Sequence, residues 1–168
     1  MDPFEQVAIG DTGVAVTRLG LGGVFVGGRE HGDGSPVTDY TESLNTIDAA
    51  YQAGVRYFDT APFYGRGRSE IRYGRALADK PRNSFVLSSK VGRLLVEDKT
   101  NPGFWDTDGI PHYEARFDMS RDGILRALDA SLERHQLGRV DILYLHDPDW
   151  ENLQDEALAT ALPTMVEL

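Results

Sequence analysis

The stretch that decides the fold is Tyr57–Gly65, which reads Tyr-Phe-Asp-Thr-Ala-Pro-Phe-Tyr-Gly. Its first residues continue an apolar run from Val55, which is typical of a buried strand bounded by turn residues. Asp59 stands at the carboxyl end of that strand, and the loop after it carries Tyr64. A helix-forming segment follows, with Ser69 as the expected N-cap. The stretch therefore joins one strand to one helix.

The same strand-then-helix order occurs four times along the chain. We expect strands at residues 17–23, 55–59, 84–91 and 140–146, with helices at 41–53, 69–77, 121–137 and beyond 155. Gly54 and Gly138 are the expected helix stops, and Ser120 is an expected N-cap. Two apolar runs around residues 10–13 predict a β-hairpin before the first unit. This order predicts an α/β fold, a parallel sheet covered by helices, in a single domain over residues 1–168.

Composition limits the classes of function. The 168 residues carry a net charge of −10 with a pI near 4.7, which argues against binding to the phosphate backbone of nucleic acid. The sequence has no cysteine, which excludes disulfides, thiolate metal sites and cysteine nucleophiles. No apolar run reaches the roughly 20 residues of a membrane helix, and the N-terminus does not resemble a signal peptide. We expect a cytoplasmic protein that binds neither nucleic acid nor membrane.

Four polar residues are predicted to meet at one edge of the sheet. Asp59, Lys90 and His146 each stand at the carboxyl end of an expected strand, and Tyr64 lies just beyond one. In βα barrels and in open sheets, ligands bind beyond these strand ends. Reduction of a carbonyl needs a proton donor, and a tyrosine phenol next to an ammonium group can serve as one. His146 would hydrogen-bond the carbonyl oxygen, and Asp59 would hold Lys90; a cofactor must carry the hydride.

Each of these residues also has an ordinary structural interpretation. Asp59 could cap a turn, Tyr64 could be a loop aromatic, and His146 could be a hydrogen-bonded core histidine. A metal site at His146–Asp149 is disfavoured without cysteine or a second well-placed histidine, so we expect no metal. Residues 20–23 lack the G-x-G-x-x-G fingerprint of a Rossmann site. Four such residues at one edge nevertheless favour catalysis.

A long stretch from Arg93 to Phe117 is expected to be irregular. Loops of this length within a compact domain are usually functional or disordered. Its aromatic content favours a lid or a substrate wall, with Trp105, Tyr113 and Arg93 as weak candidates. Packing of the loop itself explains these three residues at least as well.

These motifs resemble the aldo-keto reductase superfamily. Residues 57–65 resemble its Asp-and-Tyr signature, Leu87–Gly92 its lysine strand, and Ile142–His146 its histidine strand. The resemblance implies that Asp59, Tyr64, Lys90 and His146 are the catalytic tetrad, with Tyr64 as general acid/base. It also implies NAD or NADP as cofactor, with Asp59 and Lys90 on the nicotinamide side. The sequence is most similar to the branch of aldose, L-fucose and pyridoxal dehydrogenases, which implies oxidation of an aldose at C1.

The family fold is a (β/α)8 TIM barrel, which needs about 250 residues or more. Four βα units after a β-hairpin correspond to its N-terminal half, and most cofactor contacts are expected in the C-terminal half. We therefore expect a fragment, a truncated product or a half-barrel that pairs with another half, with little turnover by the chain alone. Its open sheet edges would favour self-association. The alternative function is a non-catalytic half-barrel that serves as an interaction or assembly module.

Overall fold

A four-stranded parallel sheet forms the centre of the molecule. The computed structural model describes residues 1–28, 39–97 and 113–168. The strand order is β3-β4-β5-β8 and every neighbouring pair is parallel, which confirms the predicted α/β class. The carboxyl ends of the strands consequently lie along one edge of the sheet. The strands are β3 Leu21–Gly22, β4 Tyr57–Asp59, β5 Val86–Val91 and β8 Ile142–Leu145.

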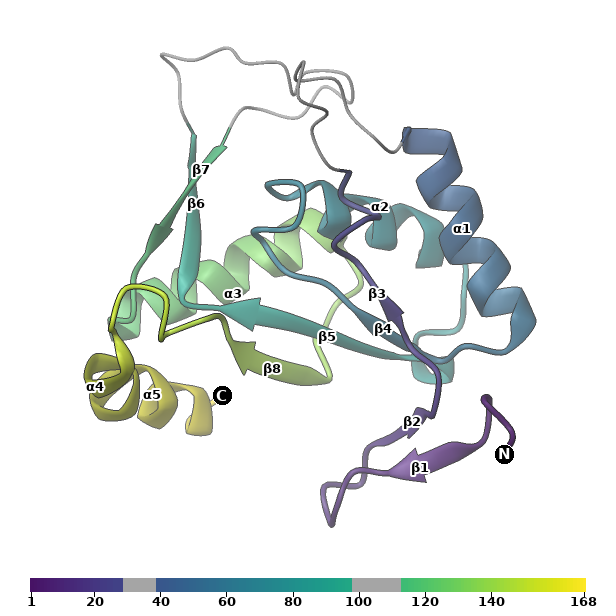
Figure 1. Ribbon diagram of the computed structural model, residues 1–168, viewed down its shortest axis with the longest axis horizontal. Coiled ribbons are helices and arrows are strands. Elements are labelled where there is room, and N and C mark those ends of the chain that lie inside the picture. Colours follow the sequence, from purple (N-terminus) through teal and green to yellow (C-terminus); the bar gives the residue numbers. More distant parts are fainter. Residues whose placement is uncertain (29–38, 98–112) are drawn as a thin grey trace.

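A helical segment follows each strand, which confirms the four predicted βα units. Helices α1, α2 and α3 pack one after another behind the sheet, and α4 and α5 close the C-terminal end of the chain (Figure 1). A 3-10 turn at Arg82–Ser84 precedes β5, and a π-helical turn at Ala157–Ala161 joins α4 to α5. The helices are α1 Tyr40–Ala53, α2 Arg68–Leu77, α3 Arg121–His135, α4 Gln154–Glu156 and α5 Leu162–Val166.

Four residues were predicted from the sequence to begin or end helices, and the structure confirms two of them. Gly54 ends α1 with a left-handed φ of 113°, and Ser120 caps α3 by accepting a hydrogen bond from the Gly123 amide at 3.1 Å. The other two predictions were wrong. The N-cap of α2 is Gly67, with φ of 93°, so Ser69 falls inside the first turn. Helix α3 ends at His135. Gln136 is its C-cap and has a left-handed φ of 56°, so the helix stops before Gly138.

Two antiparallel hairpins flank the sheet. The predicted N-terminal hairpin is confirmed as β1 Gln6–Ala8 and β2 Ala15–Thr17, so Thr17 belongs to it and not to the central sheet. The stretch expected to be irregular instead begins and ends in a second hairpin, β6 Arg93–Glu97 and β7 Tyr113–Phe117. Figure 1 shows the first hairpin near the strand starts and the second beyond the end of β5. Trp105 lies outside the described residues.

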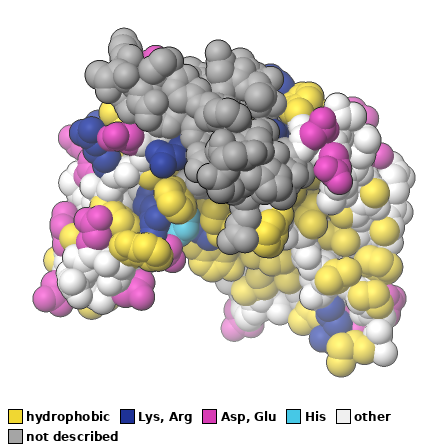
Figure 2. Space-filling model, turned by 45° about the horizontal axis from the view of Figure 1, so that its top comes forward, with side chains coloured by type: hydrophobic (Ala, Val, Ile, Leu, Met, Phe, Trp, Pro, Cys, Tyr) yellow, Lys and Arg dark blue, Asp and Glu magenta, His cyan; other side chains and the backbone are white. Residues whose placement is uncertain are grey.

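The core lies between the sheet and its helices. One cluster joins Phe58 and Leu87 of the sheet to Ile47 of α1 and Tyr73 of α2, all four fully buried. A second cluster packs Val91 against Ile124 of α3. Figure 2 shows hydrophobic side chains gathered in the middle of the face that it views. No helix within the described ranges is long and apolar enough to cross a membrane.

Candidate active site

The structure brings the four predicted residues to one edge of the sheet. Asp59 is the last residue of β4, and Lys90 is the last but one of β5. His146 directly follows β8, and its amide donates to the Val91 carbonyl at 2.9 Å. The register pairs Asp59 with Ser88 and Lys90 with Tyr144, so parallel pairing alone aligns these strand ends.

Asp59 and Lys90 form a closely bonded ion pair. The Lys90 Nζ atom lies 2.8 Å from both carboxylate oxygens of Asp59 and donates to the Thr60 carbonyl at 3.0 Å. The Ser88 hydroxyl donates to Asp59 Oδ1 at 2.7 Å. The Asp59 side chain is 27% exposed to solvent, so a ligand at the sheet edge can still reach the ion pair.

Tyr64 lies between the lysine and the histidine. The Nζ atom of Lys90 is 4.6 Å from the centroid of the Tyr64 ring. The Tyr64 and His146 rings meet edge to face, with centroids 5.7 Å apart and an interplanar angle of 87°. All four residues of the predicted set are therefore neighbours.

The backbone at Tyr64 is fixed by two glycines that face one another. Gly65 adopts a left-handed φ of 59°, and a Cβ atom on it would collide with the Gly27 carbonyl. A Cβ on Gly27 would lie 2.7 Å from the Tyr64 carbonyl oxygen. Only residues without a side chain permit this approach, so the segment around Gly27 presses directly against the loop that carries the tyrosine.

His146 is buried and electrically neutral at ordinary pH. Burial lowers the pKa of His146 to about 4, and the positive charges of Arg93 and Lys90 add to this, while Asp147 and Asp59 oppose it. Its Nδ1 atom is buried with no hydrogen-bond partner among the described residues. Its Nε2 atom lies 3.7 Å from the Asp147 carboxylate. Strongly lowered histidine pKa values are a feature of functional sites.

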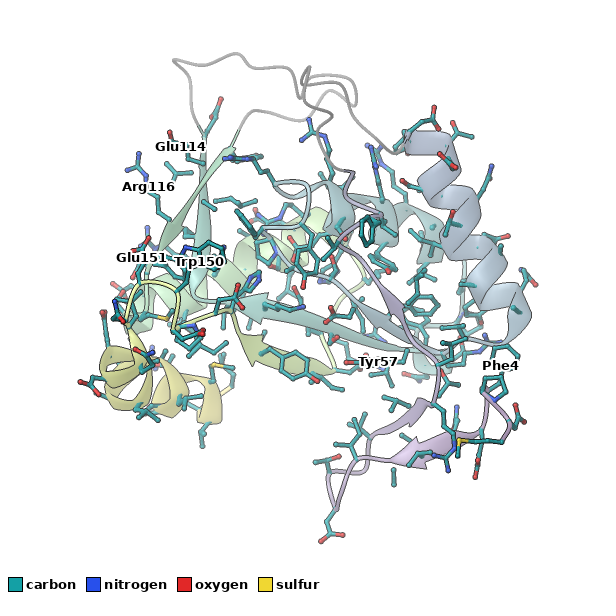
Figure 3. All side chains as sticks on the ribbon, viewed as in Figure 1. Phe4, Tyr57, Glu114, Arg116, Trp150 and Glu151 are labelled. Carbon is teal, nitrogen blue, oxygen red and sulfur yellow. The ribbon has the colours of Figure 1, made fainter. Side chains whose placement is uncertain are left out.

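A cavity of about 440 Å³ opens beside these residues, between Phe63 and the β6–β7 hairpin. Of the residues that line this cavity, only Arg93 was predicted from the sequence. The signal available for two others was their position, because Phe63 adjoins Tyr64 and Trp150 lies just beyond the histidine motif. Figure 3 shows Trp150 and Glu151 next to the hairpin and Arg116 on it. The lining residues are Phe63, Arg93, Ala115, Arg116, Phe117, Trp150 and Glu151.

The three candidates for a substrate wall fall in different places. Arg93 lines the cavity, but its guanidinium points at Asp147, 2.7 Å away. Tyr113 is half-buried at the start of β7, does not line the cavity, and its carbonyl accepts a hydrogen bond from Arg66 at 2.5 Å. Trp105 lies outside the described ranges. A second cavity, of about 460 Å³, lies between α2 and α3, and none of the four central residues lines either cavity. The first cavity adjoins the site through Phe63, whose ring packs against His146.

No cluster of His, Asp and Glu that could hold a metal ion occurs in the part of the chain that the structure describes. The groups that gather at the sheet edge are instead a lysine, a carboxylate, a phenol and an imidazole. This set suits proton transfer and the binding of a polar ligand better than it suits metal coordination.

Comparison with known proteins identifies the family. The pattern of the aldo/keto reductase family matches residues 18–167. The chain is 41% identical to D-threo-aldose 1-dehydrogenase of a Pseudomonas species over 165 residues, which cover 95% of the chain and 48% of that protein. It is 37% identical to pyridoxal 4-dehydrogenase of Microbacterium luteolum, over 85% of the chain and 43% of that protein.

A solved structure shows the same fold. An aldo-keto reductase from Pseudomonas aeruginosa superposes with a TM-score of 0.69 at 31% identity, over 97% of this chain and 55% of that one. The four βα units thus correspond to part of a TIM barrel, as predicted. The chain spans about half the length of the curated relatives it matches. By its sequence pattern, its relatives and its fold, the chain belongs to the aldo/keto reductase family.

Proposed function

We propose that this chain carries the catalytic residues of an NAD(P)-dependent oxidoreductase that oxidises an aldose at C1. The observation that carries the proposal is the close grouping of the Asp59–Lys90 ion pair, the Tyr64 ring and the neutral His146 at one sheet edge. The aldose is supported by the 41% identity to D-threo-aldose 1-dehydrogenase. Lys90 and Asp59 would hold the nicotinamide side, and the cavity beside Phe63 would take the sugar.

Tyr64 is the general acid/base of the proposed reaction. In oxidation the Tyr64 phenolate takes the proton of the C1 hydroxyl, so that a carbonyl forms at C1. The ammonium group of Lys90 stabilises the phenolate, and Asp59 keeps that ammonium in place. Asp59 and Lys90 would hold the nicotinamide side of NAD(P)⁺, which would supply the acceptor for the hydride that leaves C1. In reduction Tyr64 donates the proton instead.

His146 orients the reacting oxygen. A neutral imidazole offers one N–H donor, and the Asp147 carboxylate beside Nε2 favours the proton on that atom. Such a donor can hold the substrate oxygen without introducing a second positive charge next to the phenol.

We also propose that the chain is one domain of a cytoplasmic protein, and that its edge strands β3 and β8 favour association with a second half-barrel.

The test is replacement of Tyr64 by Phe. Formation of NAD(P)H from L-fucose and related aldoses would be measured for the chain alone. It would also be measured for the chain combined with the C-terminal half of the Pseudomonas D-threo-aldose 1-dehydrogenase. We expect Tyr64→Phe to lower turnover by about 10²- to 10⁴-fold, because it removes the general acid/base. Binding of NADPH, followed by its fluorescence, should be retained.

Tyr40→Phe is the matched control, since Tyr40 lies on α1 and contacts Arg75, away from the site. It should leave turnover unchanged. Light scattering on the same samples gives the mass, and a defined dimer would support pairing of half-barrels. Wild-type turnover in Tyr64→Phe, or no turnover in either arrangement of the wild-type chain, would contradict the proposed function.

A further inference from the structure

Arg93 lies inside a cage of aromatic rings and has a fixed partner. Its guanidinium carbon lies 4.5 Å from the centroid of Phe63, 4.6 Å from that of Phe117 and 5.4 Å from that of Trp150. The side chain is only 6% exposed. A planar guanidinium stacks on rings and forms directed hydrogen bonds, so its position here is well defined. Its NH2 group donates to Asp147 Oδ2 at 2.7 Å.

Asp147 connects this cage to the histidine. It is the residue after His146 and has a left-handed φ of 45°, which is unfavourable for a residue other than glycine. Its carbonyl accepts a hydrogen bond from the Trp150 amide at 3.1 Å, and this turn brings Trp150 over Arg93. The same Oδ2 atom that binds Arg93 lies 3.7 Å from His146 Nε2. One carboxylate oxygen thus accepts a hydrogen bond from the arginine and lies close to the histidine.

The charges that face His146 come from four segments. Lys90 lies on β5, Asp59 on β4, Arg93 on β6, and Asp147 follows β8. The uncharged Phe63 and Tyr64 rings pack edge to face against the imidazole. Two carboxylates therefore stand against two cations. Without Arg93, the two carboxylates would outweigh Lys90, and the histidine would gain a proton more readily.

We propose that Arg93 is a positioning residue: by holding Asp147, it keeps the imidazole of His146 neutral, with its proton on Nε2. The proposal deepens the function proposed above, because only a neutral imidazole gives the reacting oxygen a donor without repelling the charge on Lys90. Arg93 itself need not touch the substrate. The Asp147 oxygen nearest Nε2 fixes the tautomer, and Arg93 offsets the negative charge of that oxygen.

The experiment follows the histidine directly and needs neither cofactor nor turnover. The chain is labelled with ¹³C,¹⁵N-histidine, and ring signals are recorded by NMR from about pH 8 down to about pH 4. His146→Gln assigns the His146 signal, and the ¹⁵N shifts report which ring nitrogen holds the proton. Four variants are compared: Arg93→Met, Arg93→Lys, Asp147→Asn and the double variant Arg93→Met/Asp147→Asn.

In the wild-type chain, His146 should stay neutral down to about pH 5 with its proton on Nε2. Arg93→Met should raise the pKa of His146 towards the ordinary value of about 6.5, and Arg93→Lys should restore most of the difference. Asp147→Asn should leave the pKa at or below that of the wild type and weaken the preference for Nε2. The double variant should return close to the wild type, because the unbalanced carboxylate is gone.

The double variant separates electrostatics from loosened packing. If Arg93→Met merely admitted water, the pKa of His146 would rise equally with and without Asp147, and the proposal would be overturned. It would also be overturned if Arg93→Met left the His146 titration unchanged. Arg116→Met is the matched control, since Arg116 is an exposed cavity-lining arginine paired with Glu114, and it should not move the titration. Failure of the proposed function would appear separately, in the Tyr64→Phe assay.

Discussion

The two ends of the central sheet both hold charged clusters, yet they are bonded in opposite ways. At the strand starts, Asp141 accepts hydrogen bonds from Arg82 at 2.6 Å, from Arg139 at 2.8 Å and from the Leu87 amide at 2.8 Å. At the strand ends, His146 has a buried Nδ1 with no partner among the described residues and a pKa lowered to about 4, above all by burial. Saturated hydrogen bonding is typical of a structural cluster, whereas unused bonding capacity next to a lysine and a phenol at the carboxyl edge of the sheet favours a reactive one.

Arg82 completes the cluster at the strand starts. It also donates to the carbonyls of Leu137, Phe85 and Arg139, at distances between 2.9 and 3.2 Å. These bonds join the segment after α3 to the turn before β5. The cluster therefore ties the third and fourth βα units together, and each carboxylate oxygen of Asp141 already accepts a hydrogen bond from an arginine.

The largest effect on stability is expected at this end. Asp141→Ala removes the acceptor of three hydrogen bonds and leaves Arg82, which is 19% exposed, without its carboxylate. Loss of one partner of a largely buried ion pair costs about 3 to 5 kcal/mol, and we expect that loss in the free energy of urea unfolding. Turnover per folded molecule should stay the same.

Lys90→Met is the matched change at the other end. It should abolish turnover but cost less stability, because Asp59 keeps its bond to Ser88 and is partly hydrated. Equal loss of stability at both ends, or intact turnover in Lys90→Met, would remove the distinction between the clusters.

Two neighbouring serines of β5 test the difference across the sheet. The Ser89 hydroxyl donates to Glu70 at 2.9 Å on the helix side, where Glu70 is fully buried and also bonds Arg134 at 2.6 Å. Ser89→Ala should cost about 1.5 to 3 kcal/mol in urea unfolding without changing turnover. Ser88→Ala, which leaves Asp59 Oδ1 bonded to Lys90 alone, should cost less stability and lower turnover. A reversed order of the two stability losses would count against this assignment.

Acid should destabilise the fold through its buried histidines. The pKa of His146 is about 4 in the folded chain and about 6.5 in an unfolded one, so the unfolded chain binds the proton first as the pH falls. Its contribution to stability is complete above about pH 6.5 and should fall by about 2 kcal/mol between pH 7 and pH 5. Burial also lowers the pKa of His135, which adds in the same direction. Urea unfolding of the wild type and of His146→Gln at both pH values measures the share of His146; identical pH dependence in the two would contradict it.

The fold was predictable because its signals are local. Apolar runs of strand length, helical spacing and the Gly54 and Ser120 signals each act within a few residues, and all four βα units were found. The start of α2 was mispredicted because Ser69 has the chemistry of a cap but bonds to Thr60 at 2.8 Å inside the helix. Strands β6 and β7 were missed because their pairing joins segments separated by 15 residues, a connection far longer than the short turns from which a hairpin is recognised.

The candidate site was predictable where its residues lie at the end of a strand or in the loop just after it. Asp59, Lys90 and His146 follow from their places at strand ends. The bond between Arg93 and Asp147 crosses 54 residues and depends on how a hairpin and a loop meet. Neither residue alone indicates this contact. The ring cage around Arg93 likewise draws Phe63, Phe117 and Trp150 from three separate segments.

The contact between Gly27 and Gly65 has a consequence for how this site can change over generations. Neither position can accept a side chain while the other backbone stays in place, so a substitution at one would displace the loop of Tyr64 before any other part of the site. The two positions are 38 residues apart in sequence, yet both must be glycine for this contact to be kept. Variation in what the protein acts on would therefore have to arise elsewhere, among the rings and charges that surround the cavity.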